Sequence, residues 1–127
     1  LSGETYPDRK KGGTFGVHSE PPHIAPYLVP QECCNHMNTH STVFTLGEGK
    51  LVLEKQGQPY AFSAIPYTPH QLEQAFHAEE LPKPNRTVIT VSGAMRGVGG
   101  IDTWGSDVES SYHVHSDRDM EFSFRIF

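Results

Sequence analysis

The chain has 127 residues, enough for a single domain over residues 1–127, and it carries a net charge of −5. Its ten Lys and Arg side chains are scattered, so nothing indicates a nucleic-acid partner or binding to an anionic membrane. We expect no membrane span, because no apolar run approaches the roughly 20 residues that cross a bilayer. We also expect no signal peptide at the start of this sequence. Since the first residue is Leu1, we expect the sequence to be a segment of a longer polypeptide.

The first 41 residues are rich in residue types that oppose regular structure. Residues 1–30 contain five prolines, each of which fixes φ and removes a backbone donor. We predict an extended lead-in with at most a short strand around Thr14–His18, followed by polar, turn-forming residues at 31–41. The adjacent Cys33 and Cys34 are expected to be reduced thiols in the cytoplasm, because a bridge between neighbours is strained. A redox switch at this pair is the alternative.

Three strands are predicted in the middle of the chain, at Thr42–Leu46, Leu51–Gln56 and Pro59–Ile65. The first ends at the turn residues 47–49. Between the second and third, Gly57 and Gln58 form a two-residue signal of the Gly-X kind, which predicts a β-hairpin.

One short helix is predicted near residues 69–79. Thr68 is suited to the cap, Pro69 to the first helical position, and Gln71 completes a capping box. Pro82 then ends the element after two to three turns. The apolar stripe of this helix consists of Leu72, Ala75 and Phe76.

The C-terminal third predicts further strands. Residues 86–91 are mostly β-branched, as expected of a buried strand. Residues 120–127 alternate apolar and polar, which predicts a half-buried strand with Tyr112–His115 as its antiparallel neighbour. The predicted fold class is an all-β sandwich with one short helix.

A glycine-rich loop lies between these strands. Gly97, Gly99 and Gly100 precede Asp102 and the only tryptophan, Trp104. Glycines permit positive φ and close approach, so the loop is suited to presenting a carboxylate and an indole face to a sugar or a base. Alternatively, Trp104 belongs to the core or to a protein interface, and Asp102 accepts bonds from its own turn.

The sequence gives less support to a metal site, a catalytic carboxylate pair or a serine hydrolase site. His36 with His40, and His113 with His115, each lack the third ligand that zinc requires, so we expect no metal site. The acidic pairs lie in charged, solvated surroundings that do not resemble a pair of catalytic carboxylates. No G-x-S-x-G motif indicates a serine hydrolase.

Several segments match one known family in the same order. They are residues 4–9 (Glu-Thr-Tyr-Pro-Asp-Arg), 26–32 (Pro-Tyr-Leu-Val-Pro-Gln-Glu), 62–77, 97–105 (Gly-Val-Gly-Gly-Ile-Asp-Thr-Trp-Gly) and 120–126 (Met-Glu-Phe-Ser-Phe-Arg-Ile). Together they resemble the C-terminal β-domain, of the small-chain type, of bacterial β-galactosidases of glycoside hydrolase family two. This sequence departs from the family at Ile101, where an Asp is usual, and at residues 33–44.

The resemblance implies part of a supersandwich similar to galactose mutarotases, in an enzyme that hydrolyses terminal β-galactosides. The family's catalytic glutamates lie on a barrel domain absent here, so we expect no catalytic residue in this chain and no activity from it alone. By correspondence, Trp104 and Asp102 are substrate-binding residues, and Gly97, Gly99 and Gly100 shape their loop. Mg and Na of the parent family are bound by other domains, so no cofactor is expected here.

The implied partners are a galactoside and the remaining domains or subunit of the enzyme, in a homo-oligomer. We also expect exposed apolar surface where those parts pack. A stand-alone carbohydrate-binding or mutarotase-like module is the alternative function, and a purely structural domain is another.

Overall fold

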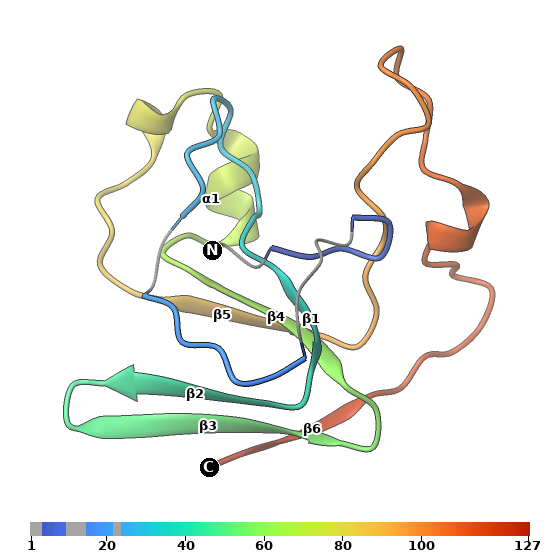
Figure 1. Cartoon of the computed structure of the whole chain (residues 1–127). Coiled ribbons are helices and arrows are strands. Elements are labelled where there is room, and N and C mark those ends of the chain that lie inside the picture. The colour runs from blue at the N-terminus through green and yellow to red at the C-terminus, as the bar shows by residue number, and fades with distance from the viewer. Residues whose placement is uncertain (1–3, 10–14, 22–23) are drawn as a thin grey trace.

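Two antiparallel three-stranded sheets form the chain, in a computed structural model that describes residues 4–9, 15–21 and 24–127. The first sheet has the order β1 (His36–Thr39), β4 (Tyr60–Ile65), β5 (Val88–Ser92). The second has the order β2 (Ser41–Leu46), β3 (Gly49–Gln56), β6 (Ser123–Ile126). The all-β sandwich class is therefore confirmed (Figure 1).

The helix α1 (Pro69–Gln74) begins as the sequence predicts. The Thr68 side chain accepts from the Gln71 backbone N–H, and the Gln71 side chain accepts from the Thr68 backbone N–H. At six residues, α1 is shorter than two to three turns, and Phe76 lies beyond it with 72% of its surface exposed. Short 3-10 turns follow at Ala78–Glu80 and, much later, at Ser110–Tyr112.

One part of the core joins the two sheets. The Tyr60 side chain is only 2% exposed, and its hydroxyl contacts Thr42 Oγ1 and the Leu53 carbonyl oxygen, each at 3.0 Å. Because Tyr60 lies on β4 while Thr42 and Leu53 lie on β2 and β3, these bonds tie one sheet to the other.

A second part of the core lies with α1. Leu72 and Ile65 pack there with the adjacent Cys33 and Cys34. The two cysteines are thiols, as predicted, with their sulfur atoms 3.6 Å apart. Burial raises the pKa of the Cys33 thiol to about 12, so this side chain is a poor nucleophile at neutral pH.

Strand pairing differs from prediction at Gly57 and Gln58. β3 pairs with β2 and β6, whereas β4 pairs with β1 and β5, so the hairpin prediction is wrong. Gly57 adopts φ +86°, and the reversal there carries the chain from one sheet to the other instead.

The C-terminal prediction is correct only in part. The strand spans Ser123–Ile126, and its neighbour is β3, with Leu53 opposite Ile126. Residues 112–115 are not its partner, because Ser110–Tyr112 forms a 3-10 turn. Of the four apolar side chains in the alternating pattern, Phe124 is half-buried while Met120, Phe122 and Ile126 are exposed.

Three smaller differences concern the other strands. β1 lies within the polar segment that was predicted to be turns. Residues 15–18 form no strand, and Thr14 lies outside the described residues. β5 begins at Val88 and is half-buried along its length rather than fully buried.

Candidate functional site

The candidate site is the glycine-rich loop, residues 96–107, on the long connection between β5 and β6. Figure 1 shows this connection, coloured from orange to red, extending along one side of the molecule away from the sheets. The two ends of the loop are joined by an ion pair between Arg96 and Asp107. The Asp107 carboxylate also accepts from the Val108 backbone N–H at 2.7 Å. The Val108 amide, together with Arg96, lowers the pKa of Asp107, so this brace is charged at neutral pH.

A second carboxylate braces the loop from the N-terminal segment. Asp8 Oδ1 accepts from the Val98 backbone N–H at 3.0 Å, and Oδ2 accepts from the Gly99 backbone N–H at 2.8 Å. Partial burial raises the pKa of Asp8, but these two amides more than offset that effect, and the net pKa is lowered. Two of the recognised motifs, residues 4–9 and 97–105, are therefore in direct contact.

The glycines shape the loop through lack of space rather than through positive φ. A Cβ on Gly97 would lie 2.7 Å from Asp8 Oδ2 and 2.8 Å from Tyr112 Cβ, and a Cβ on Gly100 would lie 2.7 Å from the Ser106 carbonyl oxygen. Gly99 is less crowded, with Asp8 Oδ2 at 3.3 Å. Within the part of the loop that was singled out, positive φ is not used; it occurs just after Trp104, at Gly105 (φ +90°).

Asp102 holds the tip of the loop. Its Oδ1 accepts from the Trp104 backbone N–H at 2.7 Å, and its Oδ2 accepts from the Ser106 hydroxyl at 2.7 Å. The Ser106 hydroxyl and the Trp104 amide lower the pKa of Asp102. This is the local-turn role that the sequence left open, and contact between Asp102 and a sugar stays a prediction.

Trp104 projects from this braced turn with 91% of its surface exposed. The alternative of a core tryptophan is therefore wrong for this chain. A flat, exposed indole on a loop fixed by three carboxylates can stack on the apolar face of a sugar ring. Such a surface can bind substrate, but bond cleavage requires acid and base groups from elsewhere.

The histidines have structural contacts. His113 Nε2 lies 3.0 Å from the Val108 carbonyl oxygen and 3.5 Å from Asp107 Oδ2, and its ring stacks on His115. The His36 ring stacks on Phe62, and the His40 ring meets Phe15 edge-on. Among the described residues, no group of three or more His, Cys, Asp or Glu side chains could hold a metal ion.

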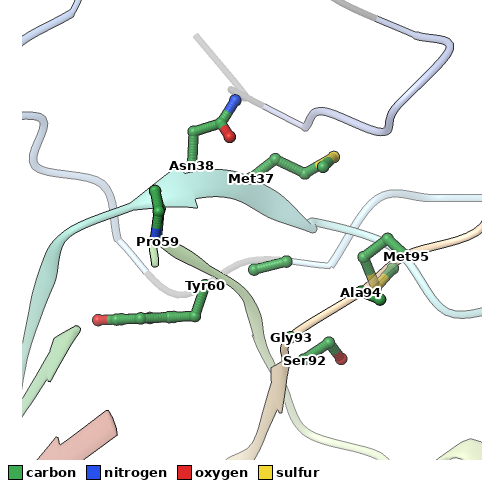
Figure 2. A pocket seen from close by; sticks show the side chains of 9 residues that line it. Met37, Asn38, Pro59, Tyr60, Ser92, Gly93, Ala94 and Met95 are labelled. Atoms are coloured by element: carbon green, nitrogen blue, oxygen red, sulfur yellow. The ribbon is translucent and has the colours of Figure 1, made fainter. Parts of the chain in front are cut away.

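A small cavity, which Trp104 does not line, lies where β1, β4 and β5 meet the start of the long connection (Figure 2). Its volume is about 100 Å³, well below the roughly 300 Å³ at which ligand pockets begin. It is lined by Met37, Asn38, Pro59, Tyr60, Ala61, Ser92, Gly93, Ala94 and Met95. A sugar-binding surface is therefore better sought at the exposed indole.

The sequence singled out Trp104, Asp102 and the glycines as candidates, but it did not indicate the side chains outside them that hold the loop. Asp8 was visible only as a member of the motif at residues 4–9, and nothing in the sequence indicated what it contacts. Arg96 and Asp107 are the two ends of the loop. They belong to no periodic pattern, so the sequence did not indicate their ion pair.

Comparison with known proteins identifies the family. Residues 2–126 match the model of the β-galactosidase small chain. The chain is 47% identical to the β-galactosidase small subunit of Latilactobacillus sakei, over 99% of this chain and 43% of the relative. It is 37% identical to β-galactosidase BgaC of Bifidobacterium adolescentis and 38% identical to a β-galactosidase of Halalkalibacterium halodurans. Those two matches cover 97% of this chain and 12% of each relative.

Each relative is thus much longer than the segment it shares with this chain. Among the described residues, no helix has the length and apolar character that crossing a bilayer requires. The chain belongs to the family of β-galactosidase small chains.

Proposed function

We propose that this chain is part of a β-galactosidase that hydrolyses terminal β-galactosides, and that Trp104 is the platform on which the sugar stacks. The catalytic glutamates then belong to a barrel domain outside this chain, as in family-two glycoside hydrolases. The observation that carries the proposal is an indole 91% exposed on a loop that is fixed by carboxylate braces.

Exposure and rigidity must occur together for this role. A large aromatic side chain is ordinarily buried, and its exposure leaves apolar surface in water. That surface becomes useful if a ligand covers it, and a loop held in advance loses little conformational entropy on binding. The contacts of Asp8, Asp102 and Asp107 fix the backbone on both sides of Trp104 without covering its ring.

Exposed apolar side chains elsewhere support a role within a larger enzyme. Ile126 and Leu46 face the side of their sheet that carries the buried Leu53, yet they are 62% and 55% exposed. Leu28 and Phe15 are 91% and 88% exposed. We infer that further parts of the enzyme cover this surface and complete a supersandwich in the C-terminal domain.

Substitution of Trp104 in the complete enzyme tests the proposal. Trp104→Ala should raise KM for a chromogenic galactoside, because loss of a stacking contact costs about 1–3 kcal/mol, or about 5- to 150-fold. Trp104→Phe should retain part of the binding. Phe76→Ala, which removes another exposed ring, is the matched control and should leave kinetics unchanged. Unaltered kcat and KM in Trp104→Ala would refute the proposal.

A second test uses the isolated 127-residue chain. It should show no turnover of the same chromogenic galactoside, since the carboxyl pair that a retaining glycosidase needs lies on another domain. Turnover by the purified chain would place catalytic groups within it and contradict their assignment to another domain.

A further inference from the structure

The brace from Asp8 differs in kind from the other two carboxylate contacts of the loop. Asp102 and Asp107 contact residues within six positions of themselves or, through Arg96, the other end of the same loop. Asp8 instead joins the loop to a segment 90 residues earlier in the chain. It is thus the contact that can fix where the loop lies relative to the sheets.

We infer that Asp8 is a positioning residue for sugar binding, which orients the loop so that Trp104 meets the substrate. The inference rests on the proposed function of Trp104 and goes beyond it by assigning a role to a residue that touches no substrate.

The contact is suited to fixing orientation. Two carboxylate oxygens engage two consecutive backbone amides, Val98 and Gly99, so the loop cannot rotate about a single bond. The carboxylate also fills the space beside Gly97, where any side chain would collide with Asp8 Oδ2 at 2.7 Å. Bonding and packing therefore specify the same placement of the loop.

Asp8 is in turn held by the sheet. Tyr6 and Arg9 exchange backbone hydrogen bonds of 3.2 and 3.1 Å, which closes the turn that presents Asp8. Thr5 donates its N–H to the Asn35 carbonyl oxygen at 2.7 Å, and its hydroxyl accepts from the Met37 amide of β1 at 2.9 Å. A continuous path of bonded residues thus runs from β1 through the turn to the loop.

Asp8→Asn is the variant that tests this path with least change in shape. The amide keeps one acceptor oxygen, but its NH2 group faces a backbone N–H where the second oxygen stood, so one of the two bonds is lost. In the complete enzyme we expect a several-fold rise in KM for a chromogenic galactoside and a smaller change in kcat. Asp117→Asn, an exposed Asp in another turn, is the matched control and should behave as the unmodified enzyme.

A double-mutant cycle separates this inference from the proposed function. If Asp8 acts through Trp104, Asp8→Asn should add nothing to KM in the Trp104→Ala background. If the effects of the two substitutions on KM are additive, the inference is wrong. It is also wrong if Asp8→Asn leaves KM unchanged while Trp104→Ala raises it. An unchanged KM in Trp104→Ala would instead refute the proposed function, and the positioning role with it.

Hydrogen exchange gives a readout that does not depend on activity. In the Asp8→Asn enzyme, the Val98 and Gly99 amides should exchange faster while β4 amides keep their protection. If the variant fails to assemble, Gly97→Ala disturbs the same contact from the loop side and should produce the same pattern of exchange and KM. Unchanged exchange at Val98 and Gly99 would contradict the inference.

Discussion

The sheets and the loop that carries Trp104 are stabilised in different ways. In the sheets and the helix α1 beside them, backbone hydrogen bonds and buried side chains such as Tyr60 and Leu72 hold the chain. In the loop, carboxylates bond backbone amides, while the largest side chain, Trp104, is 91% exposed. The difference shows how a loop can keep a defined shape without burying its own aromatic residue, which leaves that residue available to a ligand.

The largest expected effect concerns the sheet and helix side of the comparison. Leu72 is 2% exposed within the cluster beneath α1, so Leu72→Ala should lower the free energy of unfolding by about 2–5 kcal/mol through lost burial and a cavity. Urea denaturation of the chain measures this value. Phe76→Ala, four residues away and exposed, should change it by less than about 0.5 kcal/mol. Equal effects would mean that the cluster is not the stabilising core.

A smaller effect is expected from crowding the loop. Gly97→Ala places a Cβ against Asp8 and Tyr112. Overpacking of this kind typically lowers the free energy of unfolding by about 1–3 kcal/mol. The same urea titration reports it. Gly16→Ala is the control, since a Cβ there has no neighbour within 4 Å and Gly16 has no positive φ. If Gly97→Ala changed the free energy of unfolding as little as Gly16→Ala, the close contact between the loop and Asp8 would be disproved.

The smallest effect is local and depends on acid. The loop contacts lower the pKa values of Asp8, Asp102 and Asp107. An Asp whose pKa is lowered in the folded state stabilises that state when the pH is above the pKa of Asp in the unfolded chain, about 3.9. This stabilisation is lost as the pH falls through the pKa of the folded state. Below about pH 4, amide protection at Val98 and Trp104 should therefore fall before protection of β4. Hydrogen exchange followed by NMR tests this order, and simultaneous loss would show that loop and sheet are not separately stabilised.

Much of the first region could be predicted from sequence because its signals are local. Strands β2, β3 and β4 begin within two residues of their predicted starts and end where predicted, since β-branched and apolar runs are bounded by turn residues. Thr68, Pro69 and Gln71 gave the start of α1 for the same reason. β1 was missed because four residues, His-Met-Asn-Thr, with Asn38 at φ +55°, show no usable alternation.

Pairings over long distances could not be predicted in the same way. Gly57 and Gln58 have a hairpin signal, but which strands meet depends on Tyr60 and its partners in the other sheet. The contact between Asp8 and Val98 spans 90 residues, and no periodicity encodes it. Family resemblance marked both segments as important, while only the structure showed that they touch.

The central claim is that Trp104 supports the sugar, and a structure of the complete β-galactosidase with a bound galactoside tests it most directly. The account predicts the indole face within about 4 Å of the apolar face of the galactose ring, with Asp8 still bonded to Val98 and Gly99. An indole buried against another domain, or a sugar bound with no contact to Trp104, would contradict it.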